Sequence, residues 1–299
     1  MMRKYKTPVC SLIGYYLIIV ILFTSIIACT SNKENNKIVL SSLRIGILPD
    51  ESNEKLIERY TPLFEYLAVE TGIPYKLIIP KSYNELLELF HTKNIDLAYF
   101  GGYTFVKAYI SDNAIPLVMR NVDTRFTSYF LVKKDHPAQN IKDFKDKKFS
   151  FGSRLSTSGH LMPRYFLKEM GINPETFFSD TRYSGKHDLT AYWVRDGIVD
   201  LGVANYAVVN KMYEDRRLSK KQVRILWETP PYPDYVWALR SLNNKDFLIK
   251  LKDAFLSLSK TNRKHEKILE GVDAESFLPA GINDFAKLKK VIDEQQSLK

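Results

Sequence analysis

The segment KFSFGSRLSTSGHLMPRYFL, residues 148–167, decides the fold. Its first four residues alternate polar and apolar side chains, which predicts a strand. The closing MPRYFL predicts a helix that starts close to Pro163, between Gly159 and Met162, because a helix tolerates proline only in its first turn. A strand that leads through a short polar loop into a helix is the repeating unit of an α/β fold with parallel strands.

Three consecutive hydroxyl side chains, Ser156, Thr157 and Ser158, lie in the loop between this strand and this helix. The first N–H groups of a helix have no partner within it and lie at the positive end of the helix dipole, so they can bind an anion. Gly159 lets the backbone approach a ligand closely. A single hydroxyl would serve as an ordinary helix cap, and that interpretation stays open, but three exceed what a cap requires. The loop therefore predicts an anion site.

The alternation of strands and helices continues through most of the chain. It begins near residue 43, and a second set of similar build starts with the strand at residue 148. Such alternation implies mostly parallel sheets with helices on both faces. Beyond residue 244 the pattern is helical to the end of the chain. We expect two lobes, the first from residues 42–130 and 232–299 and the second from residues 131–231, with a ligand cleft between them.

The first 28 residues have a different composition from the rest. Three basic residues precede an apolar run over residues 9–28, which is the pattern of a secretory signal peptide. The residues before Cys29 resemble a bacterial lipobox, which predicts that Cys29 becomes the lipidated first residue. The run is also long enough for an uncleaved membrane anchor. Both alternatives place the folded part outside the cytoplasm, joined to the membrane by a polar tether over residues 29–41.

Charge and cysteine content exclude several kinds of site. The formal charge of +10 falls to +7 when the three basic residues of the signal peptide are removed, and this balance favours anionic ligands. The two cysteines, Cys10 and Cys29, lie in the signal peptide or at its end. The exported part therefore has no disulfide, thiolate metal site or cysteine nucleophile. Basic residues are scattered without interleaved aromatics, which argues against nucleic-acid binding.

Motifs for catalysis are absent from the sequence. It contains no P-loop, no dinucleotide fingerprint and no zinc-protease motif. Ser257 and Lys260 have the spacing of a serine–lysine nucleophile but lie in a late helical segment with no supporting motif. We therefore expect a binding protein rather than an enzyme, without metal or cofactor.

Two further stretches accompany the hydroxyl loop. DLAYFGGYTFVKAY, residues 96–109, ends a predicted strand in an aromatic–glycine step, and YSGKHDLTAYWVRDG, residues 183–197, places His187 and Asp188 at a helix start. Taken alone, such a pair is more often a cap beside a surface imidazole. In this order the three stretches resemble the PhnD-like family, the phosphate-, phosphite- and phosphonate-binding proteins of ABC transporters. The resemblance covers residues 43–240.

This resemblance implies a type II periplasmic-binding-protein fold, an α/β architecture in which two lobes with mixed sheets flanked by helices close on the ligand. The hydroxyl loop would bind the phosphoryl oxygens, His187 would help to neutralise them, and two carboxylates would contact the far end of the ligand. Aromatic rings would wall the pocket, and a phenylalanine at residue 100, where the family often has tyrosine, leaves the substrate open. The residues implied to contact the ligand are Ser156, Thr157, Ser158, His187, Asp188, Asp234, Tyr83, Tyr99 and Phe100.

The chemistry of such a pocket is consistent with this assignment. Neutral donors suffice for a phosphoryl anion in a closed site, because exclusion of water strengthens charge-assisted hydrogen bonds. A carboxylate there selects a ligand with a proton or an amino group, since a bare dianion would meet an uncompensated negative charge. We expect a monomeric, membrane-anchored lipoprotein that delivers a phosphorus oxyanion to an ABC permease and ATPase complex. A sensory protein that acts on a membrane kinase or receptor, and a scaffold without a small ligand, are the alternatives.

Overall fold

The computed structural model describes residues 41–241 and 244–296. The predicted signal peptide, Cys29 and all of the predicted tether except Ser41 lie outside these residues. Within the described ranges, no helix combines the length and the apolar composition that crossing a membrane requires.

The first lobe is built on a mixed sheet of six strands in the order β11-β4-β10-β3-β1-β2. β1 pairs in parallel with β2 and β3, whereas β10 runs antiparallel to β3 and β4, and β11 runs antiparallel to β4. The strands are β1 (Leu43–Ile47), β2 (Tyr75–Ile78), β3 (Leu97–Phe100), β4 (Ile115–Arg120), β10 (Val236–Leu239) and β11 (Phe277–Pro279).

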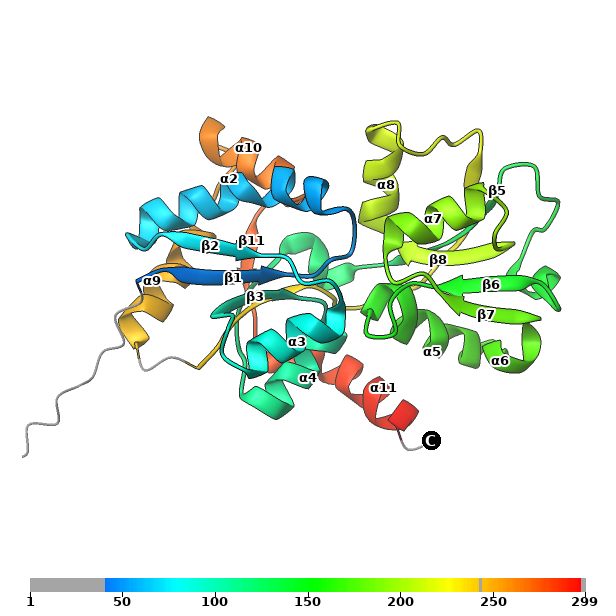
Figure 1. The fold of residues 1–299 in the computed structure, drawn as a ribbon, viewed down its shortest axis with the longest axis horizontal. Helices are drawn as coiled ribbons and strands as arrows, with labels where there is room; N and C mark the ends of the chain where they lie inside the picture. Colours follow the sequence, from blue (N-terminus) through cyan, green and yellow to red (C-terminus); the bar gives the residue numbers. More distant parts are fainter. Residues whose placement is uncertain (1–40, 242–243, 297–299) are drawn as a thin grey trace, which may run out of the picture. The chain divides into compact units, whose positions relative to one another are not determined.

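Helices cover both faces of this sheet, with α2 and α10 on one side and α3 and α4 on the other (Figure 1). They pack through buried apolar residues that recur on one side of each helix, as in α2, where Tyr60, Leu63, Phe64 and Leu67 are buried. The helices of this lobe are α2 (Asn53–Thr71), α3 (Tyr83–His91), α4 (Gly102–Asp112), α9 (Lys245–Leu256), α10 (Arg263–Gly271) and α11 (Ala286–Gln296).

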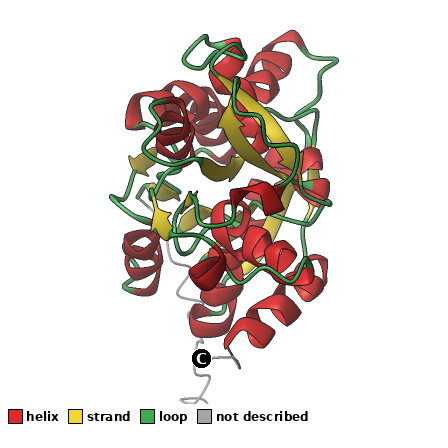
Figure 2. Ribbon diagram, turned by 90° about the vertical axis from the view of Figure 1, so that its right-hand side faces the viewer, coloured by secondary structure: helices red, strands yellow, loops and turns green. Residues whose placement is uncertain are grey.

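The second lobe is built on a mixed sheet of five strands in the order β7-β6-β8-β5-β9. β6 is parallel to β7 and β8, and β5 is antiparallel to β8 and β9. The strands are β5 (Ser128–Lys133), β6 (Lys148–Phe151), β7 (Asp180–Tyr183), β8 (Leu201–Asn205) and β9 (Val223–Glu228), and the helices are α5 (Met162–Glu169), α6 (Pro174–Phe177), α7 (His187–Arg195) and α8 (Tyr206–Glu214). Figure 2 shows strands enclosed between helices, so the predicted α/β architecture with two mixed sheets is confirmed.

Two segments connect the lobes, one from β4 to β5 and one from β9 to β10. They pair with each other through an isolated bridge between Phe126 and Tyr232 and through a 2.9 Å hydrogen bond from the Asp234 N–H to the Asp123 carbonyl. The second sheet starts at Ser128, inside the range that we assigned to the first lobe. The two crossings therefore lie side by side, as a hinge requires.

The buried carboxylate of Asp96 joins two strands at one end of the first sheet. Asp96 has no exposed side-chain area and accepts hydrogen bonds from Arg44 Nε at 2.8 Å and from Arg240 Nη2 at 2.8 Å. Burial alone would raise the pKa of Asp96, but the hydrogen bonds from Arg44 and Arg240 outweigh it and lower the pKa. This carboxylate links the start of β1 to the end of β10.

We predict that Asp96→Asn lowers the free energy of unfolding by about 2–3 kcal/mol, because it weakens bonds to two arginines at a buried position. Urea unfolding measures the loss. Asp293→Asn is the matched control, because Asp293 pairs with Lys289 on an exposed helix surface and should change stability by less than about 0.5 kcal/mol. Equal losses in the two variants would contradict the role of Asp96.

Candidate functional site

A π-helical turn precedes the predicted helix. Residues Thr157–Leu161 form this turn, and α5 starts at Met162, within the predicted range from Gly159 to Met162. Pro163 has no N–H, which leaves nearby carbonyls of the preceding turn without their usual donor. The Gly159 carbonyl accepts instead from the Gly152 N–H at 2.8 Å, and the Ser158 carbonyl from Ser128 Oγ at 2.7 Å.

These bonds fix the loop but use part of its donor capacity. The Gly159 N–H donates to Ser156 Oγ at 2.9 Å, and the Leu161 N–H donates to the Ser156 carbonyl at 3.0 Å. Two N–H groups that we expected to be free for an anion are therefore engaged. Ser156 is the helix cap, yet its hydroxyl only accepts in this bond, so its hydrogen stays available for a ligand.

His187 enters the site as a neutral donor. It has no exposed area, and burial lowers its pKa to about 3. Its Nδ1 accepts from the Asn205 N–H at 3.2 Å, which places the hydrogen of the neutral ring on Nε2. Nε2 lies 3.4 Å from Tyr83 Oη and 3.5 Å from Ser156 Oγ. In this structure His187 is therefore a hydrogen-bond donor without charge, and its implied contact with the anion stays a prediction.

Contacts between the lobes bring the hydroxyl loop to the start of α4. The Tyr103 N–H of the first lobe donates to Thr157 Oγ1 of the second at 3.0 Å. The neighbouring Gly102 N–H donates to Asp234 Oδ1 at 2.9 Å. A Cβ on Gly101 would lie 3.3 Å from Thr157 Oγ1 and 3.3 Å from Asp234 Oδ1, so glycine is what lets these two side chains meet here.

Three of the predicted site residues carry a buried polar atom with no hydrogen-bond partner within the described part of the chain: Tyr99 Oη, Ser158 Oγ and Asp234 Oδ2. A polar group buried without a partner costs free energy, so native structures rarely keep one without a functional reason. Two of these atoms can donate and one, a carboxylate oxygen, accepts when ionised. Each of these atoms is therefore a candidate ligand contact.

Asp234 places a carboxyl group among the neutral donors of this site. Burial raises its pKa to about 7, while the Gly102 N–H and the Thr157 and Ser158 hydroxyls act in the opposite direction. The carboxylate thus lies beside the hydroxyl loop. Asp188 lies in other surroundings, where burial and Glu51 raise its pKa and Lys186 and Arg217 lower it.

The predicted aromatic residues separate into two groups. Tyr99 and Phe100 are consecutive on β3, so their rings point to opposite faces of the sheet. Tyr99 stacks on Tyr235 with ring centroids 5.1 Å apart, whereas Phe100 packs against Phe90 of α3. Tyr83, the first residue of α3, contacts His187 across the lobes. Phe100 therefore contributes to core packing, and Tyr83 and Tyr99 contribute to the polar site.

The sequence interpretation missed a hydrogen-bond chain between the lobes. Asn205 Nδ2 donates to Tyr235 Oη at 2.9 Å, and Tyr235 Oη donates to Asp50 Oδ2 at 2.8 Å. Burial is the main cause that raises the pKa of Asp50 to about 6. Asp50 follows β1, at the carboxyl end of a parallel strand, where ligands bind in α/β folds, and this position was the signal available in the sequence.

Further contacts close the lobes at both sides of the site. The His187 N–H donates to the Asp50 carbonyl at 3.0 Å, and Gln295 Nε2 of α11 donates to the Leu161 carbonyl at 3.2 Å. His160, next to the hydroxyl loop, is engaged with Arg164, because its Nε2 accepts from Arg164 Nε at 3.0 Å, and burial lowers its pKa to about 4. Among the described residues no cluster of three or more His, Cys, Asp or Glu side chains could hold a metal ion.

Comparison with known proteins gives a consistent assignment. The sequence model of the family described as "ABC transporter, phosphonate, periplasmic substrate-binding protein" matches residues 45–285. A probable ABC transporter phosphite-binding protein, PhnD1 of Prochlorococcus marinus, is 30% identical over 261 residues, which is 83% of this chain and 88% of the relative. A phosphate-import protein, PhnD of Mycolicibacterium smegmatis, is 28% identical over 72% of this chain and 71% of the relative.

The solved structure of Prochlorococcus marinus PhnD1 in complex with methylphosphonate has the same fold. It superimposes with a TM-score of 0.80 at 29% identity, and the match covers 86% of this chain and 98% of that chain.

We predict that Asp234→Asn stabilises the ligand-free protein above neutral pH. The folded-state pKa of about 7 exceeds the unfolded value of 3.8, so Asp234 binds its proton more tightly in the folded state, and stability falls as the pH rises from 3.8 to about 7. The amide keeps an acceptor for the Gly102 N–H without the buried charge. Urea unfolding at pH 5 and pH 8 should show a gain that is larger at pH 8 by about 2–3 kcal/mol. The same difference between variant and wild type at both values would contradict this assignment.

Proposed function

The chain belongs to the periplasmic phosphonate substrate-binding proteins of ABC transporters, and from this membership we propose that the site around Ser158, His187 and Asp234 binds a small phosphorus oxyanion in its singly protonated form. The protein is an extracytoplasmic solute-binding component of a transporter and not an enzyme. The single observation that carries the proposal is the set of buried, unpartnered polar atoms formed by Tyr99 Oη, Ser158 Oγ and Asp234 Oδ2.

Hydroxyl groups supply most of the proposed donors. Ser156, Thr157 and Ser158 are all at least 98% buried, as is the His187 ring with its Nε2 hydrogen. Thr157 and Ser156 accept one N–H each, so the hydrogen of each hydroxyl can point to a second oxygen. Such neutral donors bind an anion strongly once water is excluded, because hydrogen bonds to an ionised acceptor are about twice as strong as neutral ones. This arrangement needs no basic side chain at the anion.

Asp234 sets the protonation state of the proposed ligand. Its Oδ2 is buried beside the hydroxyl loop, and an anion bound there meets this oxygen at short range. Two negative oxygens without a proton between them repel each other strongly at low dielectric. A phosphonate, phosphite or phosphate monoanion has a hydroxyl that donates to Asp234, whereas sulfate has none at neutral pH. The carboxylate therefore selects phosphorus oxyanions over sulfate.

The proposal extends to the attachment and assembly of the protein. We propose that Cys29, outside the described residues, is lipidated and tethers the protein to a membrane, and that the protein acts as a monomer. In this form it would present its bound anion to the permease of an ABC transporter. The family match concerns transport proteins, so transport takes precedence here over the sensory alternative.

Calorimetric titration of the chain without residues 1–29 tests the function. Methylphosphonate, phosphite, phosphate, an aminoalkylphosphonate and sulfate are compared at pH 7. We expect one of the four phosphorus ligands to bind most tightly and sulfate to give no heat of binding. Affinity should fall as the pH rises and the ligand loses its last proton. If sulfate binds as tightly as the best phosphorus ligand, the role of Asp234 is overturned. If none of the phosphorus ligands gives a heat of binding, the proposed function is overturned.

Ser158→Ala is the sharpest test of the loop, because Ser158 Oγ is one of the buried polar atoms without a hydrogen-bond partner in the described part of the protein. We predict an affinity loss of about ten- to a hundredfold at an unchanged melting temperature. Thr157→Val should lose more, since it also removes the acceptor of the Tyr103 N–H. An unchanged affinity of Ser158→Ala in calorimetry would remove this loop from the site.

A further inference from the structure

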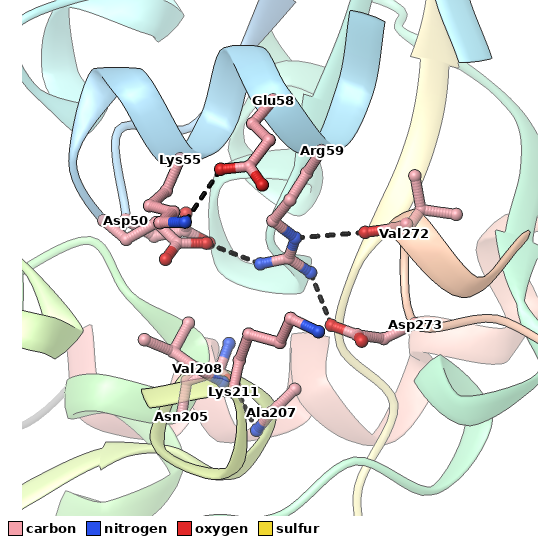
Figure 3. Close-up of polar contacts among 12 residues, drawn as sticks. Asp50, Lys55, Glu58, Arg59, Asn205, Ala207, Val208, Lys211, Val272 and Asp273 are labelled. Atoms are coloured by element: carbon pink, nitrogen blue, oxygen red, sulfur yellow. Dashed lines mark hydrogen bonds and ion pairs between the residues drawn. The ribbon is translucent and has the colours of Figure 1, made fainter. Parts of the chain in front are cut away.

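A buried glutamate lies at the edge of the lobe junction, next to the site. Glu51 has no exposed side-chain area, and its Oε1 accepts from Arg59 Nη1 of α2 at 2.5 Å. Arg59 also reaches Asp273 through Nη2 at 2.5 Å. Figure 3 shows the Arg59 guanidinium between the turn at Asp50 and the Asp273 carboxylate. These charges all belong to the first lobe, so this part of the cluster does not depend on closure.

The second oxygen of Glu51 is bound from the opposite lobe. Arg217 Nη2, in the segment between α8 and β9, donates to Glu51 Oε2 at 3.2 Å. The same nitrogen donates to Asp215 at 3.2 Å, within its own lobe. When the lobes separate, Arg217 keeps Asp215, and Glu51 keeps only Arg59. The Glu51–Arg217 pair is therefore a bond that exists in the closed arrangement alone.

Other contacts at the same edge join the same two lobes. Lys186 Nζ donates to the Glu51 carbonyl at 3.3 Å, and Lys55 Nζ lies 3.9 Å from the Asp215 carboxylate. Lys55 also pairs with Glu58 at 2.7 Å, so its link to the opposite lobe is the weaker of its two contacts. Within the described residues, Glu51–Arg217 is the cross-lobe ion pair with a fully buried carboxylate.

We infer that Arg217 is a positioning residue that raises ligand affinity by stabilising the closed lobes through Glu51, without a contact to the ligand. The inference rests on the proposed function, since it concerns the same site. When a ligand binds only the closed form, its apparent affinity equals its intrinsic affinity multiplied by the fraction of ligand-free protein that is closed. A bond made only after closure raises this fraction and slows opening, so its loss acts on the dissociation rate more than on the association rate.

The test uses the full-length protein in mild detergent, with methylphosphonate and phosphite as probes. Tryptophan fluorescence in a stopped-flow instrument gives the association and dissociation rate constants. For Arg217→Ala we expect dissociation about tenfold faster, association changed less than about twofold, and a melting temperature within about 2 °C of wild type. Arg217→Lys, which keeps the charge but loses the planar guanidinium, should be intermediate.

Arg216→Ala is the matched control. It removes the same charge from the adjacent, exposed position of the same segment, which forms no ion pair with the other described residues, so it should leave both rate constants unchanged. A purely structural role for Arg217 predicts a lower melting temperature with an unchanged dissociation rate, and this result would overturn the inference. Equal effects of the Ala variants at 216 and 217 would also overturn it. Absence of binding by the wild-type protein would instead count against the proposed function.

Discussion

The bond from the Tyr103 N–H to Thr157 Oγ1 joins the two lobes at the point where the proposed ligand binds. It places a hydroxyl of the second lobe at the start of α4 in the first lobe, next to Gly102 and Asp234. The hydroxyls, the imidazole and the carboxylate of the site are buried in this arrangement, and burial strengthens their hydrogen bonds.

Neutral donors dominate this site, as the sequence analysis expected of a closed pocket. Burial keeps His187 unprotonated, and the Asn205 N–H on Nδ1 directs its single hydrogen toward Tyr83 and Ser156. A protonated imidazole at this depth would carry a large desolvation penalty in the absence of an anion. The neutral ring avoids that penalty and still donates a hydrogen bond. It attracts a distant anion less strongly than a charged ring would.

Much of this could be predicted from the sequence, because the decisive elements have local signals. The strand, the three hydroxyls and Pro163 lie within 20 residues, and their pattern predicts a strand, a loop and a helix. The π-helical start at Thr157 could not be predicted, since it depends on Gly152 and Ser128, which bind the carbonyls that Pro163 leaves free.

The position of Asp234 was missed for a similar reason. Its neighbours Gly102 and Thr157 are distant in sequence and meet it only through the pairing of β10 with β3 and the closure of the lobes. In the sequence, Glu51 likewise resembles an ordinary surface residue before a helix. In the structure, Arg59 and Arg217 enclose its carboxylate. Sequence patterns indicate which residue types occur together along the chain, whereas these sites combine side chains from three or four separate segments.

The last described helix has a practical consequence for protein engineering. α11 packs on α4, where its Leu288 lies against Gly102, and through Gln295 it reaches the Leu161 carbonyl of the opposite lobe. A fluorescent protein fused after this helix would be attached to an element that touches both lobes beside the binding site. Its orientation would follow opening and closure, which makes the carboxyl-terminal end of the chain a suitable attachment point for a biosensor.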